Sequence, residues 1–220
     1  MQRDGEPSDL LAEEESERMK TDSFSAKRKP SSVKLNKAST AILVVDMLND
    51  FLKQGGKMVL DGGGVLIPPM RRLLAQARKV GIPVVYVNDS HRPGLREDRE
   101  FKKRSEHCIE GTWGAAVIDD IKPKKKDFVV LKHRFSGFYD TDLDLTLKDL
   151  CVDTVIVMGV VTNICVRSTI HDAFFRGYKV LVPRDCVMAT GEREQESSLY
   201  DIETHFGDVT TSDKLVRMMA

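Results

Sequence analysis

Short, almost uninterrupted apolar runs recur along this chain from Thr40 onward, and longer segments with helical spacing separate them. The runs are rich in Val, Ile and Leu and lack the alternation of apolar and polar residues that marks a half-exposed strand. Runs of this kind are typical of parallel strands that are covered on both faces. The six candidate strands lie at residues 41–46, 83–89, 128–132, 154–159, 178–182 and 208–212.

Four of the intervening segments have the spacing of amphipathic helices. In the first, Pro68 and Pro69 suit the start of a helix and Gly81 suits its end. The alternation of strands and helices predicts a three-layer α/β/α fold around an open, mostly parallel six-stranded sheet with right-handed crossovers. The four predicted helices lie at residues 68–80, 143–150, 163–176 and 192–206.

The amino-terminal segment, residues 1–38, differs in composition from the rest of the chain. It holds a run of acidic residues, then the basic cluster at 27–29, and few large apolar side chains. Such a segment buries too little apolar surface to offset its ordering entropy. We interpret it as a disordered or artificially appended tail whose charges are solvated, and residues 39–220 as a single domain.

The balance of charge excludes several classes of partner. Lys and Arg number 34, Asp and Glu also number 34, and the formal net charge is 0. Nucleic acids and acidic membranes are usually met by a clustered basic excess, which this balance does not supply. No run approaches the roughly 20 apolar residues of a membrane helix, and the polar amino terminus does not resemble a secretory signal. We therefore expect a cytoplasmic protein that acts on a small molecule.

Four reactive residue types follow the predicted strands at their carboxyl ends. Asp46 ends the first strand, Asp89 and His91 follow the second, Lys132 ends the third, and Cys165 lies after the fourth. Ligands of open parallel sheets bind at this edge. Singly, each has a structural alternative: a turn Asp, a Lys that reaches solvent, or a small apolar Cys. Together they indicate a catalytic site.

In that site Cys165 is the candidate nucleophile. It falls in the first turn of a predicted helix, where the helix dipole and the Lys132 ammonium both favour a thiolate. Asp46 would take the thiol proton, a role that a pKa raised by burial would suit. The other cysteines form no CxxC pattern and are interpreted as structural, without a disulfide scaffold or zinc ribbon. They are Cys108, Cys151 and Cys186.

Five stretches of the chain resemble the isochorismatase-like cysteine hydrolase superfamily, which includes nicotinamidases, N-carbamoylsarcosine amidases and ureidoacrylate amidohydrolases. They are VVDMLNDF, YVNDSH, EHCIEGTWGA, LKHRFSGFYDTDLD and GVVTNICVRSTIHDAFFRGYKV, within about residues 40–212. The resemblance implies a Rossmann-like fold and a catalytic triad of Asp46, Lys132 and Cys165. It also implies a cis peptide bond between Val160 and Val161, with the Val161 and Cys165 amides as the oxyanion hole. Members commonly assemble as homodimers or homotetramers, and we expect the same here.

The resemblance also implies a possible metal site. Asp89, His91 and His107 match elements that bind a divalent metal beside the nicotinamidase active site, and the set suits Zn, Fe or Mn. The alternative is that these residues serve hydrogen bonds or substrate contacts without a metal, since the triad requires no cofactor. Nicotinamidases often place a Trp three residues before the second His. This chain has Arg104 there, which weakens nicotinamide as a substrate.

Several residues are candidates for substrate contacts. Phe51, Phe135 and Trp113 are expected to wall the pocket, with core packing as the alternative. The stretch RFSGFYDTDLD resembles the ureido and carbamoyl amidases more than the nicotinamidases. An arginine would then hold a substrate carboxylate through a bidentate hydrogen bond, and spacing does not select one. The three candidates are Arg104, Arg134 and Arg167.

We therefore predict a cysteine-dependent amidohydrolase that releases ammonia from a small carboxamide or ureido compound through a thioester-type intermediate. The first alternative is a nicotinamidase with a divalent metal beside the site. The second is a thiol redox or binding protein on the same fold, and the third is a structural oligomeric module with an inactive site. Cys165 argues against the vinyl-ether hydrolysis of siderophore-type isochorismatases, which lack this nucleophile.

Overall fold

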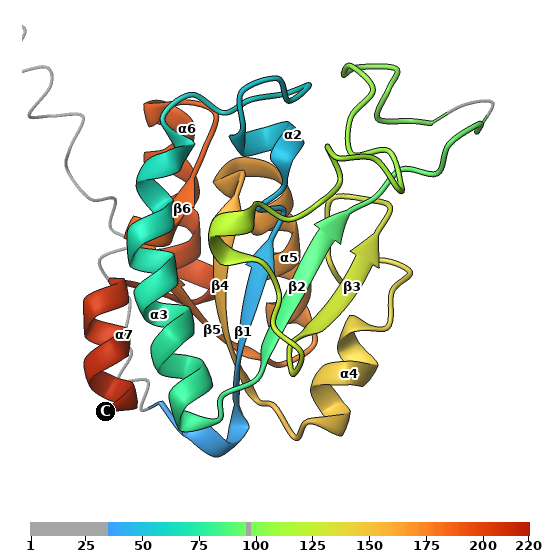
Figure 1. Ribbon diagram of the computed structural model, residues 1–220. Helices are drawn as coiled ribbons and strands as arrows, with labels where there is room; N and C mark the ends of the chain where they lie inside the picture. The colour runs from blue at the N-terminus through green and yellow to red at the C-terminus, as the bar shows by residue number, and fades with distance from the viewer. Residues whose placement is uncertain (1–34, 96–97) are drawn as a thin grey trace, which may run out of the picture. The chain divides into compact units, whose positions relative to one another are not determined.

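The computed structural model describes residues 35–95 and 98–220 (Figure 1). The predicted tail, residues 1–38, lies outside the described residues except for its last four, and so does its basic cluster. Within those four, Leu35 packs against the hydrophobic core. The 3-10 turn η2 (Lys37–Ser39) then leads directly into the first strand. The predicted domain is thus described from its first residue, apart from residues 96–97.

The described residues form a seven-stranded sheet in the order β3-β2-β1-β4-β5-β7, with β6 paired to β4. All of these strand pairs are parallel, which confirms the predicted open α/β sheet. Every residue of β1, β2 and β4 is buried, and this explains their uninterrupted apolar sequences. The strands are β1 (Thr40–Val45), β2 (Val84–Asp89), β3 (Phe128–Lys132), β4 (Thr154–Val160), β5 (Lys179–Pro183), β6 (Val187–Met188) and β7 (Asp208–Thr210).

Helices cover both faces of this sheet. The crossovers from β1 to β2 and from β4 to β5 run in opposite directions across it, so right-handed connections put α3 and α5 on opposite faces. Helix α7 packs beside α3 (Figure 1), which completes the predicted three layers. The helices are α2 (Asn49–Leu52), α3 (Ile67–Val80), α4 (Leu143–Asp149), α5 (Arg167–Phe175), α6 (Glu192–Asp201) and α7 (Ser212–Met219), with 3-10 turns η3 (Gly63–Leu66), η4 (Asp119–Ile121) and η6 (Arg184–Cys186).

Two predicted helices contain a π-helical turn. The segment predicted at 163–176 begins with η5 (Thr162–Val166) and continues as α5. The segment predicted at 192–206 starts as α6 and ends in η7 (Ile202–Phe206). Turns of this kind are frequent at functional sites, and η5 holds the candidate nucleophile Cys165.

Two helices and one strand were not predicted from the sequence. Helix α2 and strand β6 are too short to show a period. Helix α7 begins inside the segment predicted as a strand at 208–212, where β7 ends at Thr210. Thr211 ends that strand early because its hydroxyl accepts a hydrogen bond from the Lys214 amide at 3.3 Å and caps the new helix.

Strands β1 and β4 approach one another very closely at the edge that carries the candidate site. Gly159 lies opposite Val45 in the ladder and has φ of +126°. A Cβ atom at this position would lie 1.9 Å from the carbonyl oxygen of Val45. Only glycine fits such a backbone approach, so Gly159 lets the ends of the two strands converge.

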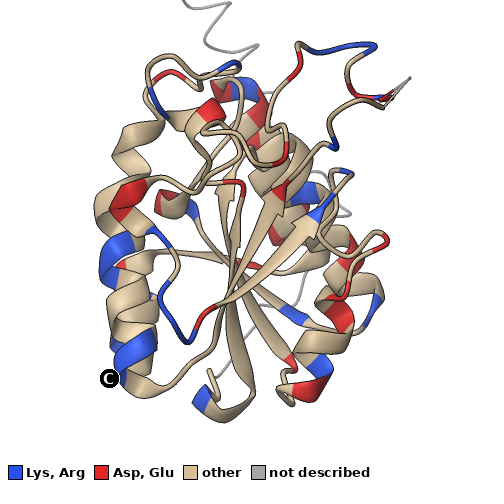
Figure 2. Cartoon of the chain, turned by 45° about the vertical axis from the view of Figure 1, so that its right-hand side comes forward, with Lys and Arg blue, Asp and Glu red and all other residues tan. Residues whose placement is uncertain are grey.

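The charged residues are spread over the surface elements. Figure 2 shows Lys and Arg interspersed with Asp and Glu along the helices and loops. Among the described residues, no helix combines the length and the apolar character that crossing a lipid bilayer requires.

Candidate active site

The carboxyl edge of the sheet brings the three predicted triad residues together. The fully buried Lys132 ends β3, and its Nζ lies 2.9 Å from Asp46 Oδ2. The same ammonium lies 3.3 Å from Asp89 Oδ1 and donates to Cys165 Sγ at 3.7 Å. Side chains from four separate strands and turns therefore meet at one cation, as the sequence predicted.

Asp46 is held in place by the neighbouring strand β2. Its amide donates to the carbonyl of Val87 at 3.1 Å, and its Oδ1 accepts from the Asp89 amide at 2.7 Å. Its φ is 51°, in the left-handed region that Asp adopts more readily than most residues. The chain turns sharply there as β1 ends, and this holds the carboxylate at Lys132.

The charges of this buried pair are set by burial and by one another. Burial raises the pKa of Asp46 to about 6, the Lys132 ammonium opposes that rise, and Asp89 adds to it. Burial lowers the pKa of Lys132, but Asp46 and Asp89 outweigh it and hold that pKa well above its usual value. Lys132 is therefore a cation, and Asp46 is an unusually basic carboxylate.

Cys165 differs from the sequence expectation in its charge. Burial raises the pKa of its thiol, and the carboxylates of Asp46 and Asp89 raise it further, while Lys132 alone lowers it. Lys132 lowers this pKa as predicted, but burial and the two carboxylates outweigh it, so the net shift is opposite to the one expected. The raised pKa of Cys165 favours the protonated thiol, whose proton has a basic acceptor in Asp46.

The segment after Lys132 connects it to the helix that follows Cys165. The Gly137 amide donates to Thr169 Oγ1 at 3.0 Å, and that hydroxyl donates to the carbonyl of Cys165 at 2.7 Å. A Cβ at Gly137 would lie 2.5 Å from Val87 Cγ1, so the close approach requires glycine. These contacts fix the distance between the ammonium and the thiol.

The peptide bond between Val160 and Val161 is cis, as the family resemblance implied. It lies between the end of β4 and the π-turn η5, directly before the segment that carries Cys165. Val160, Val161 and Cys165 all line the same cleft.

That cleft has a volume of about 910 Å³, within the range of small-molecule sites. Asp46 and Cys165 lie on its lining, and so do Phe51 and Phe135, the predicted wall residues. Trp113, the third predicted wall, is not among the described residues that line it and is 55% exposed. Its own carbonyl accepts from an asparagine amide in α2, so the loop is anchored by its backbone and the indole faces outward.

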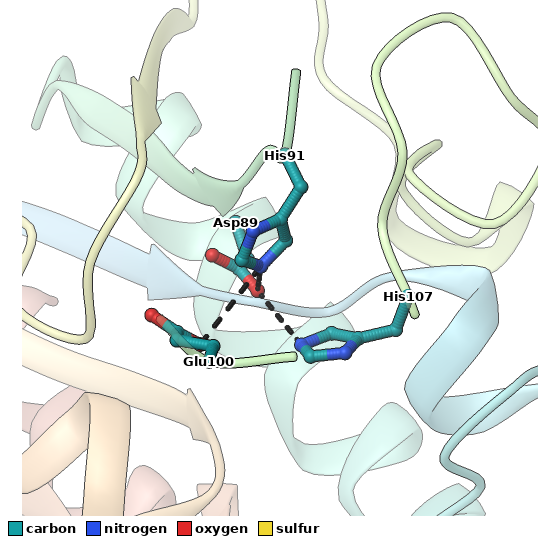
Figure 3. Close-up of side chains that lie close together, drawn as sticks. All are labelled: Asp89, His91, Glu100 and His107. Atoms are coloured by element: carbon teal, nitrogen blue, oxygen red, sulfur yellow. Dashed lines mark hydrogen bonds and ion pairs between the residues drawn. The ribbon is translucent and has the colours of Figure 1, made fainter. Parts of the chain in front are cut away.

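The three predicted metal ligands lie together with a fourth carboxylate, Glu100. Ligand atoms of Asp89, His91, Glu100 and His107 all lie within 4.8 Å of one another, and Figure 3 shows the side chains pointing toward one another. Nε2 of His91 and of His107 lie 3.2 Å and 3.4 Å from Asp89 Oδ2. Glu100 Oε1 is buried without a hydrogen-bond partner in the described structure, which is consistent with a role as a cation ligand.

Outer contacts orient both histidines. His107 donates from Nδ1 to the Ser105 carbonyl at 2.7 Å, so that in the neutral ring Nε2, which faces Asp89, is the nitrogen that can bind a metal. His91 Nδ1 lies 2.7 Å from Asp98 Oδ2. Without a cation, burial lowers the pKa of His91, but Asp89 and Asp98 outweigh it and raise that pKa to about 9. The cluster thus needs a positive charge, which a divalent metal or a proton on His91 supplies.

Comparison with known proteins assigns the chain to a family. The family model described as "Isochorismatase domain" matches residues 40–214, which include every strand, the three triad residues and the four-residue cluster. The chain belongs to the isochorismatase family. It is therefore an isochorismatase-family hydrolase, as the sequence motifs indicated.

Individual relatives of this isochorismatase-family chain agree with the match. A protein of Methylobacterium radiotolerans named ureidoacrylate amidohydrolase RutB is 32% identical over 206 residues, covering 83% of this chain and 80% of the relative. A cysteine hydrolase from Pseudomonas syringae pv. phaseolicola has a TM-score of 0.82 at 31% identity, covering 87% and 97% of the two chains. The N-carbamoylsarcosine amidase of Thermoplasma acidophilum has a TM-score of 0.72 at 36% identity, covering 80% and 97%.

Sequence reasoning missed two acidic residues that shape this isochorismatase-family site. Glu100 lies in a long loop between β2 and β3, where neither periodicity nor a short motif marks it. Asp50 lies in the quoted stretch VVDMLNDF, and its carboxylate accepts from the amides of Cys108 at 2.7 Å and Lys57 at 3.0 Å. A Cβ at Gly114 would lie 2.2 Å from that carboxylate, so Asp50 ties three loops together beside the cleft.

Proposed function

We propose that this isochorismatase-family hydrolase is a cysteine-dependent amidohydrolase that releases ammonia from a small carboxamide or ureido compound. One observation carries the proposal. The Cys165 thiol lines the cleft and contacts Lys132, which in turn contacts the basic carboxylate of Asp46. A nucleophile with a proton acceptor beside it is what attack on an unactivated amide requires. The names of the amidohydrolase and amidase relatives support the same reaction class.

The first half-reaction forms an acyl-enzyme. Cys165 Sγ attacks the substrate carbonyl carbon, and its proton passes to the Asp46 carboxylate. The carbonyl oxygen becomes an oxyanion that accepts hydrogen bonds from the Val161 and Cys165 amides, and one such donor contributes about 3 kcal/mol. The C–N bond then breaks, Asp46 returns the proton to the leaving nitrogen, and ammonia departs. The product is a thioester or, when the substrate is a ureido compound, an N-substituted S-carbamoyl group (R–NH–CO–S), whose hydrolysis gives a carbamate that loses CO2.

The second half-reaction reverses these roles with water. Asp46 takes a proton from a water molecule, and the resulting hydroxide attacks the thioester carbon. The C–S bond breaks, and Asp46 returns the proton to Cys165 Sγ, which restores the resting thiol. A pKa of about 6 suits Asp46 for both steps, because it both accepts and donates a proton near neutral pH.

Lys132 provides the fixed charge of the site. Its ammonium lies between the carboxylates of Asp46 and Asp89 and within 3.7 Å of the sulfur. Negative charge that moves from Asp46 to the sulfur or the substrate during the reaction stays beside the same cation. Because Lys132 is fully buried and ion-paired, it needs no rearrangement between steps.

The test of this function is ammonia release across a panel of nicotinamide, pyrazinamide, N-carbamoyl amino acids and ureidoacrylate. We expect turnover of the ureido or carbamoyl compounds. Turnover of the pyridine and pyrazine carboxamides alone would establish the nicotinamidase alternative. A peroxide-induced disulfide at Cys165 without turnover of any amide would establish the redox alternative, which the neutral resting thiol disfavours.

We further propose that Asp89, His91, Glu100 and His107 hold one divalent cation. Two neutral imidazoles and two carboxylates suit zinc, iron or manganese. When bound beside the cleft, such an ion supplies a Lewis acid that orients a water molecule or a polar atom of the substrate. The protein itself orients the ligands through Asp98 and Ser105, as described above.

Metal content tests that cluster independently of activity. After incubation with Zn²⁺ or Mn²⁺ and desalting, we expect about one ion per chain in the wild type and less than a tenth of that in His107→Ala. The exposed His205→Ala is the matched control and keeps its metal. Equal and negligible metal in all three proteins would contradict the site and favour a protonated His91 in its place.

A further inference from the structure

Arg104 lies on one wall of the active-site cleft. It belongs to the connection between β2 and β3, and its backbone amide donates to the Glu100 carbonyl at 2.9 Å. The same connection carries His91 and His107, which are buried in the four-residue cluster. The guanidinium itself is exposed and contributes to the lining of the cleft. The wall therefore presents an exposed cationic side chain on a hydrogen-bonded backbone.

The other two arginines that the sequence proposed for a substrate carboxylate have protein partners. Arg167 Nη2 pairs with Asp201 Oδ2 at 2.9 Å, and Arg134 Nη1 donates to the His133 carbonyl. Neither is among the described residues that line the cleft. The structure thus selects Arg104 from three candidates that spacing left equivalent.

The charges along the cleft are arranged unevenly. The deep carboxylates of Asp46 and Asp89 face the Lys132 ammonium. The rim carboxylates of Asp61 and Glu192 come from the loop after α2 and the start of α6, whereas the β2–β3 connection rises on the other side of the sheet edge (Figure 1). Among the described residues, Arg104 is the one Lys or Arg of the lining, and the Glu100 carboxylate on the same connection belongs to the four-residue cluster.

We propose that the substrate carries a carboxylate in addition to the carbonyl that Cys165 attacks, and that Arg104 binds this carboxylate. The inference rests on the proposed amidohydrolase function and narrows its substrate to an N-carbamoyl or ureido acid. The planar guanidinium forms two parallel hydrogen bonds to a carboxylate, which fixes the direction as well as the position of the substrate. Phe51 and Phe135 border the space for the carbon skeleton between the two ends.

This arrangement orients the substrate within the cleft. An anionic end is repelled by the Asp61 and Glu192 wall and attracted to the Arg104 wall, so the scissile group has one preferred approach to Cys165. A neutral aromatic carboxamide would gain nothing from Arg104. Discrimination between an acid and its neutral analogue is therefore the property that Arg104 controls.

The experiment compares pairs of substrates that differ only in this charge. N-carbamoylglycine and N-carbamoyl-β-alanine are each measured beside their methyl esters, with ammonia release as the readout. For the wild type we expect kcat/KM to favour the better acid over its ester by roughly 10- to 100-fold, the range of charge-assisted hydrogen bonds. In Arg104→Met this ratio falls to about 1, with the change mainly in KM. Arg104→Lys keeps part of the preference, because it keeps the charge and loses the planar fork.

Lys103→Met is the matched control, since it removes the same charge from the same loop at a residue that does not line the cleft. We expect its acid-to-ester ratio to equal that of the wild type. An unchanged ratio in Arg104→Met, or equal losses on acid and ester, would overturn the role of Arg104. Absence of ammonia from every acid and ester with the wild type, by contrast, would overturn the proposed function itself.

Discussion

Replacing Cys165 with Ala will abolish ammonia release while the fold remains intact. The substitution removes the sulfur that forms the covalent bond in the proposed mechanism, and no other described residue of the cleft lining carries a thiol. Loss of a catalytic nucleophile commonly lowers kcat by about a million-fold. The side chain loses one atom at the cleft surface, so the free energy of unfolding should change by about 1 kcal/mol or less.

The matched control for this prediction is Cys151→Ala. Cys151 is an exposed cysteine beyond the end of α4, away from the residues that line the cleft. We expect it to retain ammonia release at the wild-type rate, and both variants to show wild-type circular dichroism and urea midpoints. Residual turnover above about a hundredth of wild type in Cys165→Ala would contradict a covalent mechanism through this sulfur.

Replacing Lys132 with Met will destabilise the protein strongly as well as inactivate it. Met has a similar length, but it leaves the carboxylates of Asp46 and Asp89 buried without their cation. Breaking a buried ion pair by removing one partner costs about 3–5 kcal/mol. We expect a loss of that size in urea denaturation at pH 7. Lys148→Met, which removes an exposed ion pair with Asp144, should change the free energy of unfolding by about 0.5 kcal/mol or less.

The pH dependence and a second variant show whether buried charge or poor packing causes the loss of stability in Lys132→Met. The pKa of Asp46 is already raised to about 6, and without Lys132, which lowers it, that pKa rises further. A carboxyl whose folded-state pKa is raised destabilises the fold as the pH rises through that value. The loss in the free energy of unfolding of Lys132→Met should therefore shrink as the pH falls from 7 to 5. Asp46→Asn combined with Lys132→Met should recover part of the lost stability. A loss independent of pH and unrelieved by the double variant would indicate a packing defect instead.

The strands could be predicted from the sequence because a parallel strand buried on both faces consists of a nearly continuous run of apolar residues. Residues 128–132 match β3 in both bounds. β2 and β4 differ from their predicted ranges by one residue at one end, and β1 and β5 are each shifted by one residue. The two-residue β6 and the four-residue α2 are too short to show a run or a period in the sequence. The π-turn η5 could not be predicted, because its residues have the same spacing as an α-helix start and the widened turn reflects how they pack beside β4.

The candidate site could be predicted to the extent that each residue follows a strand. Asp46, Lys132 and Cys165 come together because parallel strands end at one edge, which is a rule of topology. Glu100 joins the cluster through the path of a long loop, which local sequence does not encode. The charge of Cys165 depends on how many carboxylates surround the sulfur, and this number follows only from three-dimensional contacts.

In the proposed mechanism, Cys165 carries the acyl group between ammonia release and hydrolysis. Hydroxylamine tests it most directly, because this nucleophile competes with water for the thioester even when the intermediate does not accumulate. With a carboxamide or N-carbamoyl substrate that the wild type turns over, we expect a hydroxamate or N-hydroxyurea product that rises with hydroxylamine concentration at the expense of the acid or the carbamate. Ammonia released at the wild-type rate with the acid as the only product, at every hydroxylamine concentration up to molar, would contradict it.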